Sequence, residues 1–420
     1  MAMAAKLDKS RFTDVSDVVK WRLCLGCGAC EYACPEKKIK LINFIDQGIR
    51  PVVLPTGDCS GCSDCVTVCP GVGVSHDPMM KTAEGVINML TEGWGPVLEI
   101  WEGHATDKVI RFDGSSGGLA SALALYCIEN EGMRGVVHVG NDSEEQYKNK
   151  STFSRTRDDI LATTGSRYSP ASPCDLFQAI EDAEGACVFI GKPCDLEGLR
   201  KTQSIRPGLS KNIGVAIGIF CAGTPSTQGT VDLLAKYGIS HEDVEELRYR
   251  GRGWPGSFSV RLKSDAEWLE LATYEEAWDF LQAYRPYRCH VCPDGTSEFA
   301  DISCGDPWYR SIDADEPGKS LVLVRSEKGR EIVKGAIKAG YIQLTPVEPE
   351  ILERSQKELL RKRGAIWGRV TTMKTLGIPA PHFQGFSLLQ NWLKLSGGQK
   401  IRSILGTAKR VITRNYFRPL

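Results

Sequence analysis

The last 62 residues of this chain contain no aspartate or glutamate, because Glu358 is the final acidic residue of the 420. Twelve of the 52 Lys and Arg residues lie beyond it. The net charge of zero therefore combines a body of −12 with a carboxy-terminal segment of +12. Such an uneven distribution makes that segment a candidate for contact with an anionic partner.

Long apolar runs are also missing. Eighteen apolar residues follow one another nowhere, and residues 1–11 hold no stretch long enough for a secretory signal. We therefore expect a cytoplasmic protein without a membrane-spanning helix. Sixteen cysteines in such a chain favour metal ligation over disulfides.

A composition of 42% apolar and 25% charged residues indicates a soluble globular protein of two or three domains. We expect no nucleic-acid partner, and homo-oligomer formation stays open.

Eight of the cysteines form a repeated pattern before residue 71. The spacing C-x-x-C-x-x-C-x-x-x-C-P occurs twice and is typical of two 4Fe–4S clusters, in which the fourth cysteine of each run serves the other cluster. Disulfides or zinc knuckles are the alternatives. We assign Cys24, Cys27, Cys30 and Cys69 to the first cluster, and Cys59, Cys62, Cys65 and Cys34 to the second.

Residues 97–220 alternate between short apolar runs and a helical segment. We expect strands at 97–101, 136–139, 186–190 and 215–220, and a helix at 119–130. The glycine-rich stretch 71–78 marks a boundary, with a new domain beginning near Trp94. The predicted fold class is α+β and α/β: a two-cluster ferredoxin-like module, a mixed α/β core, and a basic helical tail.

Two polar loops suggest an anionic, aromatic cofactor. Asp113–Gly118 precedes an apolar helical segment, where backbone amides favour phosphate, although a turn that only caps the helix has the same sequence. Residues 163–168 add a guanidinium and a phenol.

A third loop contains a formal G-x-G-x-x-G at Gly251, Gly253 and Gly256. We reject a dinucleotide fold there, because a strand at 257–262 follows instead of a helix. The arginines at 248, 250 and 252 and Trp254 suit a phosphate or a flat ring. A solvated surface turn is the alternative.

Four further cysteines lie in loops far apart in the sequence: Cys194, Cys221, Cys289 and Cys292. They fit a third cluster, but their spacing leaves a structural zinc or free thiols open. Cys127 and Cys187 fall in apolar segments typical of buried thiols. Cys174 and Cys304 stay undecided.

Six motifs occur in an order that resembles one family. The chain is similar, over residues 95–350, to the beta subunits of deazaflavin-reducing hydrogenases and dehydrogenases, whose relatives include hydroxymethyl-chlorophyll reductase and ferredoxin-dependent divinyl reductase. The motifs are Ser115–Gly118, Gly165–Tyr168, Gly191–Asp195, Phe220–Pro225, Arg248–Gly256 and the segment from Arg288 to Asp306.

The resemblance implies an FAD next to a core 4Fe–4S cluster. It places Cys194, Cys221, Cys289 and Cys292 on that cluster, and it divides the chain at 1–80, 95–180, 181–350 and 351–420. The chlorophyll branch has a degenerate amino-terminal cysteine pattern, so the complete run here argues against a tetrapyrrole substrate. The flavin residues would be Ser115, Ser116, Gly117, Gly118, Ser166, Arg167 and Tyr168, and the substrate-side candidates are Arg252, Trp254 and Asp306.

Two functions follow from these expectations. In the first, the chain takes electrons from ferredoxin or a similar low-potential donor and uses FAD to reduce an organic substrate with hydride. In the second, it is the electron-transfer beta subunit of a larger hydrogenase or dehydrogenase and exchanges hydride with a deazaflavin. A redox sensor without flavin is a third, non-catalytic possibility.

The tail combines apolar and basic residues at helical spacing. Residues 386–393 and 401–412 predict two amphipathic segments that lie on an anionic membrane surface or dock on an acidic partner. An ordinary terminal helix with a solvated basic face is the alternative.

Overall fold

The computed structural model describes residues 12–55, 59, 61–76, 84–312 and 316–420. The amino-terminal residues on which we judged the absence of a signal lie outside this range, as does Ser60 beside the second cysteine run. Among the described residues, no helix combines the length and apolar character needed to span a bilayer.

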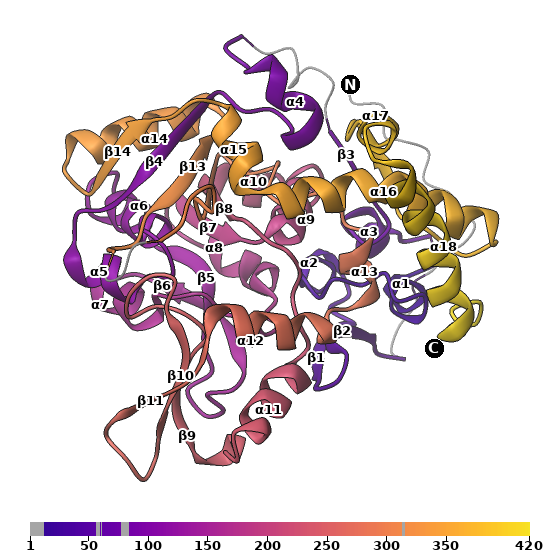
Figure 1. The fold of residues 1–420 in the computed structure, drawn as a ribbon, viewed down its shortest axis with the longest axis horizontal. Helices are drawn as coiled ribbons and strands as arrows, with labels where there is room; N and C mark the ends of the chain where they lie inside the picture. Colours follow the sequence, from indigo (N-terminus) through magenta and orange to yellow (C-terminus); the bar gives the residue numbers. More distant parts are fainter. Residues whose placement is uncertain (1–11, 56–58, 60, 77–83, 313–315) are drawn as a thin grey trace.

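A mixed eight-stranded sheet forms the core (Figure 1). Its middle strands β5, β7, β8 and β12 are parallel, whereas β4, β6, β13 and β14 run antiparallel to their neighbours. The order across the sheet is β14 (Ile342–Pro346), β4 (Glu99–Ala105), β13 (Ser320–Val324), β12 (Ile302–Gly305), β8 (Ile213–Ile219), β7 (Cys187–Gly191), β5 (Val136–Asn141) and β6 (Asn149–Ser154).

Both faces of this sheet are buried, as parallel strands require. Val188 on β7 packs with α6 (Leu119–Glu129) and α14 (Glu327–Lys338). Its neighbour Phe189 points to the other face, where α8 (Phe177–Glu181), α9 (Pro193–Gln203) and α10 (Pro207–Asn212) pack. The helix and the four strands expected between residues 97 and 220 are present, with their ends shifted by up to four residues.

The cysteine-rich module is built into this second layer. Its helix α2 (Ala29–Ala33) shares an apolar cluster with α9 and with β7. Around it lie α1 (Val15–Lys20), the hairpin of β1 (Ile39–Phe44) and β2 (Gly48–Val53), and α3 (Asp64–Thr67).

The expected boundary at residues 71–78 contains a strand in its described part. β3 (Gly73–Ser75) pairs in parallel with β15 (His382–Gln384), some 300 residues later. The amino-terminal module and the carboxy-terminal segment are therefore joined through backbone hydrogen bonds.

A smaller antiparallel sheet projects at the bottom of Figure 1. It consists of β9 (Val244–Arg248), β10 (Ser257–Leu262) and β11 (Trp268–Thr273), which pack against α11 (Thr227–Lys236) and α12 (Tyr274–Leu281). The formal glycine motif connects β9 to β10, strand to strand, so rejecting the dinucleotide fold is confirmed.

The remaining helices flank these sheets. The carboxy-terminal ones, at the right of Figure 1, are α16 (Lys357–Thr375), α17 (Leu388–Leu393) and α18 (Gly397–Thr413). The others are α4 (Asn88–Trp94), α5 (Lys108–Asp113), α7 (Arg157–Thr163), α13 (Tyr287–His290) and α15 (Glu350–Ser355). The predicted fold class is confirmed.

Candidate functional site

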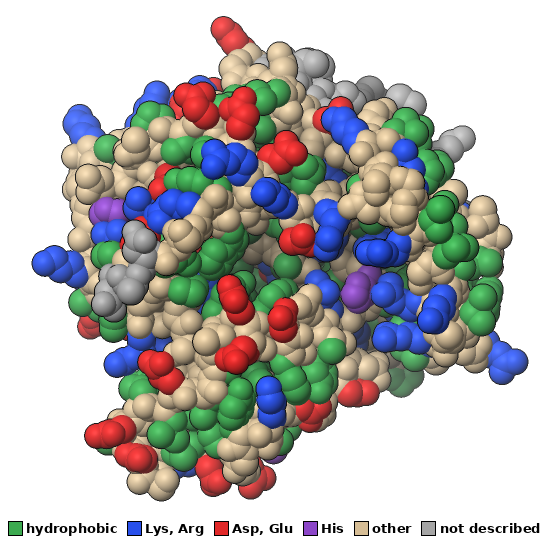
Figure 2. Space-filling view, viewed as in Figure 1, with side chains coloured by type: hydrophobic (Ala, Val, Ile, Leu, Met, Phe, Trp, Pro, Cys, Tyr) green, Lys and Arg blue, Asp and Glu red, His purple; other side chains and the backbone are tan. Residues whose placement is uncertain are grey.

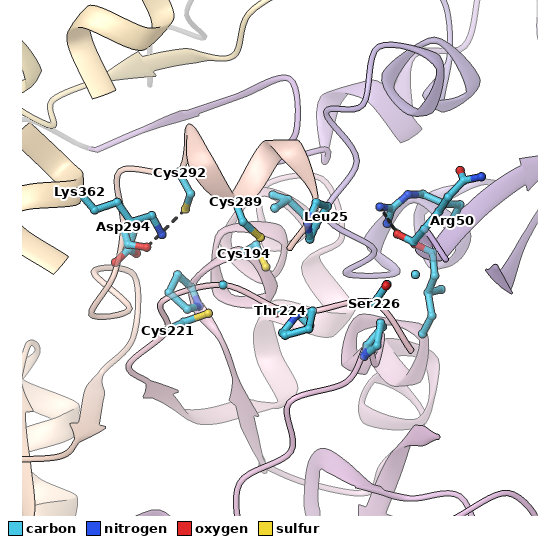
Figure 3. Close-up of a pocket in the computed structure, with 18 residues that line it drawn as sticks. Leu25, Arg50, Cys194, Cys221, Thr224, Ser226, Cys289, Cys292, Asp294 and Lys362 are labelled. Atoms are coloured by element: carbon cyan, nitrogen blue, oxygen red, sulfur yellow. Dashed lines mark hydrogen bonds between the residues drawn. The ribbon is translucent and has the colours of Figure 1, made fainter. Parts of the chain in front are cut away.

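Cys194, Cys221, Cys289 and Cys292 line one cavity (Figure 3). Cys194 lies in the first turn of α9, Cys221 follows β8, and the other two lie on α13 and just after it. The topology of the sheet thus brings together four thiols that sequence spacing left apart.

The four thiols surround a space instead of a single point. All sixteen cysteines are free thiols. Within the described ranges, no three His, Cys, Asp or Glu side chains are arranged to hold one metal ion. A tetrahedral zinc needs all its sulfurs about 2.3 Å from one point, whereas a 4Fe–4S cluster takes one thiolate at each of its four irons.

Burial and two lysines set the electrostatics of this cavity. Burial raises the pKa of Cys292 to about 12 and that of Cys194 well above the usual value, so a metal that bound these thiols would have to displace their protons. The Lys192 ammonium, held by Asp195 at 2.8 Å, and that of Lys362 oppose these shifts. Positive charge here would offset the negative charge of a cluster bound by these thiolates and would raise its potential.

Cys24, Cys27, Cys30 and Cys69 line a second cavity, the set assigned to the first front cluster. Leu25 lines both this cavity and the core cavity, so the two cavities adjoin at this residue. Burial raises the pKa of Cys69 to about 12. The two thiol sets are close enough for the charge on Cys27 to raise the pKa of Cys194.

The other front set lies nearer the surface. Cys34 is buried in a small apolar cluster with Val15 and Ile39, and Cys65 packs against this cluster. Cys59 and Cys62, in contrast, are exposed. The backbone N–H of Cys62 donates to the Cys59 carbonyl at 3.1 Å. The three sets thus run from an exposed pair of thiols to the core cavity.

The two polar loops predicted to hold an anionic cofactor meet, and the arginine-rich third loop lies against them. The Ser166 N–H donates to Ser115 Oγ at 2.5 Å. Arg248 on the third loop donates to the carbonyls of Asp113 and Thr164, both at 3.3 Å.

Part of the glycine-rich turn already has hydrogen-bond partners within the protein. Gly117 donates its N–H to Ser320 Oγ at 2.8 Å, and Ser116 shares a hydrogen bond of 2.8 Å with the same hydroxyl. Gly118 has a φ of 71°, and a Cβ there would lie 2.7 Å from the Ile110 carbonyl. Close packing therefore explains both glycines without any ligand.

Arg167 fits an anion better. It lies half-buried beside this turn, and its only hydrogen bond in the described structure is a weak one to Asn141 Oδ1 at 3.4 Å. Its Nε is buried without a partner, and burial lowers the pKa of the guanidinium to about 10. A buried donor without a partner is costly, so this atom suits a phosphate oxygen.

An aromatic group adjoins Arg167. Tyr168 lies 5.3 Å from Trp278 and 5.6 Å from Tyr249, measured between ring centroids. Beyond them, Trp308 stacks on Tyr274 at 5.6 Å and on Trp254 at 5.8 Å. Such faces can hold a flat ring.

The substrate-side candidates differ in their surroundings. Asp306 binds the buried Arg250 through both oxygens and accepts from Trp254 Nε1 at 3.0 Å. Its carboxylate therefore holds the loop that contains Trp254. Arg252 is exposed, 5.2 Å from the Trp268 ring.

Sequence reasoning missed several residues between the cavities. The Cys174 thiol, buried next to Cys27, lowers the pKa of Cys27 by hydrogen bonding. Glu197 is buried with both carboxylate oxygens unpartnered, and burial raises its pKa well above the usual value. Lys192 belongs to the Gly191–Asp195 motif, whereas no motif in the sequence pointed to Leu25 or Glu197. Cys127, Cys187 and Cys304 lie in the apolar cores.

Comparison with known families supports this architecture. Residues 100–177 and 185–350 match the two parts, N-term and C terminus, of "Coenzyme F420 hydrogenase/dehydrogenase, beta subunit". The chain belongs to this family. Residues 23–74 match the 4Fe-4S dicluster domain. The chain is therefore an iron–sulfur oxidoreductase of the F420 hydrogenase/dehydrogenase beta subunit family with a ferredoxin module in front.

Relatives within the family differ in length. The coenzyme F420 hydrogenase subunit beta of Methanococcus voltae is 27% identical over 66% of this chain and 96% of that protein. A subunit of the F(420)H(2) dehydrogenase of Methanosarcina mazei is 24% identical over 88% of this chain and 94% of its own length.

The coenzyme F420-dependent sulfite reductase of Methanocaldococcus jannaschii is 25% identical over 77% of this chain, which spans about half (52%) of that protein. A chain of the F420-reducing [NiFe] hydrogenase complex from Methanosarcina barkeri shares the fold, with a TM-score of 0.54 and 24% identity over 69% of this chain and 97% of its own.

Proposed function

We propose that this chain is an electron-transfer beta subunit that exchanges hydride with a deazaflavin of the coenzyme F420 class. The observation that carries the proposal is the row of three cysteine sets, from the exposed Cys59 and Cys62 to the core cavity, with the cavities of the last two adjoining at Leu25. Single electrons pass readily between centres placed so closely. Several relatives are named for coenzyme F420.

A deazaflavin accepts hydride, whereas iron–sulfur clusters supply single electrons. A bound FAD provides the conversion between the two. Arg167 and Ser115 would hold its diphosphate, and the aromatic group around Tyr168 would hold a ring system. The unpartnered Nε of Arg167 supports this placement.

A stand-alone reductase that takes electrons from ferredoxin is the second candidate. The complete front module favours it, because the chain can collect electrons at its exposed cysteine pair without another subunit. The family comparisons favour the beta subunit instead, since the matched relatives include named subunits of hydrogenases and dehydrogenases.

The test uses the full chain, purified without oxygen, with its iron and flavin counted. We expect reduced viologen to drive the reduction of F420, which is measured as the loss of the deazaflavin absorbance. In Arg167→Gln, flavin should bind at least tenfold more weakly while iron and sulfide stay at the wild-type level. Arg155→Gln is the matched control, because Arg155 is exposed and lies over the Phe153 ring.

Three outcomes contradict the proposal. Material that contains iron and flavin but leaves F420 unchanged would exclude the deazaflavin as substrate. Turnover of an organic substrate by the isolated chain, without F420, would favour the stand-alone reductase. Equal flavin binding in Arg167→Gln and Arg155→Gln would exclude Arg167 from the flavin site.

A further inference from the structure

Helix α18 packs on the rest of the protein through its small and mostly polar residues. Its buried residues are Ser403, Thr407 and Val411, and they face α16, where Gly368 lies against Ser403. A surface helix normally buries its apolar stripe. Here small and mostly polar residues make the contact.

The apolar side chains of α18 are therefore left outside. Ile401, Leu405 and Ile412 are each about 60% exposed, at 59%, 63% and 62%. With about 100° per residue they form one stripe, roughly opposite the buried face. Figure 2 shows hydrophobic side chains gathered at the right edge of the molecule, where Figure 1 places α18. Further exposed apolar residues of this region are Leu389, Leu393, Ile404, Phe417 and Leu420.

The charged residues that α18 carries beside this stripe are all positive. Arg402 and Lys409 follow its edge, and both are exposed. No carboxylate can pair with them from the same segment, because none occurs after Glu358. We call the exposed stripe with its basic edge the α18 face.

The α18 face is fixed to the body. The terminal Leu420 donates its N–H to the Lys20 carbonyl on α1 at 3.0 Å, and Tyr416 packs edge-on against Tyr287 with centroids 4.7 Å apart. A membrane or partner would therefore meet a helix that is already folded and oriented, which lowers the entropic cost of binding.

We propose that the α18 face binds the surface of an anionic lipid bilayer. A helix of 17 residues, about 25 Å long, with an aliphatic stripe and basic flanks is suited to lie in the interface of a bilayer. The basic flanks of the helix complement the negative surface potential of an anionic bilayer. The stripe holds only aliphatic side chains, whereas protein interfaces are enriched in Trp, Tyr and Met.

Binding in this orientation would bring the exposed cysteine pair near the membrane. Helix α1 bonds to the carboxy terminus at Lys20 and, at its other end, the Val15 N–H hydrogen-bonds the Cys65 thiol. The second front cysteine set is thus about one short helix away from the chain terminus.

The experiment is sedimentation of the full-length, cofactor-loaded protein with vesicles. We expect binding to vesicles of phosphatidylcholine with phosphatidylglycerol, at least tenfold weaker binding to phosphatidylcholine alone, and weakening by salt. Leu405→Ser/Ile412→Ser and Arg402→Gln/Lys409→Gln should each weaken binding at least tenfold, with iron content and viologen-driven activity unchanged.

Matched controls change the same residue types elsewhere on the surface. Leu269→Ser on β11 and Lys334→Gln/Lys338→Gln on α14 should bind vesicles as the wild type does. The proposal fails if the intact protein does not sediment with anionic vesicles, or if the α18 variants bind as tightly as the controls. It also fails if the α18 substitutions abolish assembly with a protein subunit while leaving lipid binding unchanged.

Discussion

The buried guanidinium of Arg250 binds both carboxylate oxygens of Asp306, at 2.9 Å and 2.7 Å. The pair joins the loop between β9 and β10 to the chain after β12, and so orients Trp254. Arg250 also lies over the Tyr274 ring at 4.4 Å. This ion pair therefore positions the aromatic group that contains Trp254. Neither partner has an unpaired charge with which to bind a substrate.

Removing one charge of this pair should destabilise the fold. Asp306→Asn leaves the charge of buried Arg250 unpaired, and we expect the free energy of unfolding to fall by about 3–5 kcal/mol. Denaturant midpoints measure the change. The control Glu246→Gln breaks a partly exposed pair with Arg261 in the same small sheet and should cost less than about 1 kcal/mol. If Asp306→Asn keeps its stability but loses turnover, Asp306 acts in the chemistry instead.

Loss of one core thiol should remove one cluster only. In Cys221→Ala we expect about four fewer iron atoms per chain, because the core cavity loses one of its four ligands while both front sets stay complete. Iron and sulfide analysis measures this. The control Cys304→Ala changes a cysteine that packs in the apolar core and does not line the cavity, and this variant should keep all its iron. Equal iron in the two variants would contradict the core-cluster assignment.

The parts of this site differed in how far the sequence could reveal them. The front cysteines follow one another at short spacing, so their chemistry could be read directly. Cys194, Cys221 and Cys289 are separated by whole strands and helices, and only the topology of the sheet makes them neighbours. Leu25 gave no signal because its role as a shared wall depends on how the front module packs on α9.

Long-range contacts also explain which features of the fold the sequence did not reveal. The stretch at Gly73–Ser75 has the composition of a linker, but its partner strand β15 lies about 300 residues later. Phe386 was grouped with the apolar residues of a terminal helix, whereas it is buried before α17 begins, near His76. The tail was rightly predicted to be helical, yet periodicity alone left open whether the apolar stripe of α18 faces outward or packs on the body.

A buried histidine should make stability depend on pH. Burial lowers the pKa of His138 to about 4, and its Nε2 hydrogen-bonds Ser154 Oγ at 2.7 Å. The unfolded chain takes up this proton near pH 6.5, so the stability is complete above 6.5 and is lost as the pH falls toward 4. Between pH 7.5 and 5.5 we expect a loss of about 1 kcal/mol from this group.

The measurement compares denaturant midpoints of the wild type and His138→Gln across this range. The variant has no group to titrate at this position. Between pH 7.5 and 5.5 its free energy of unfolding should therefore fall by about 1 kcal/mol less than that of the wild type. A parallel decline in both proteins would show that His138 is not the origin of the acid sensitivity.

Two glycines should respond in opposite ways to the same substitution. A Cβ at Gly368 on α16 would meet Ser403 Oγ and would lie 2.8 Å from Trp392 Nε1, so α17 and α18 would have to move. A Cβ at Gly406 on α18 meets nothing within 4 Å. Gly368→Ala should therefore lower the thermal midpoint, at a cost of about 1–3 kcal/mol. Gly406→Ala should raise it, because alanine favours a helix by about 1 kcal/mol over glycine.

Hydrogen exchange along α18 distinguishes a local from a global effect. If α18 is held by close packing on α16, its amides should exchange faster in Gly368→Ala than in the wild type, while those of β7 and β8 stay protected. In Gly406→Ala they should exchange more slowly. Unchanged exchange in Gly368→Ala would mean that the hydrogen bond of Leu420 to Lys20 and the packing of Tyr416 on Tyr287 hold the helix without the glycine contact. The inward polar face of α18 would then be a consequence of that anchoring instead of its cause.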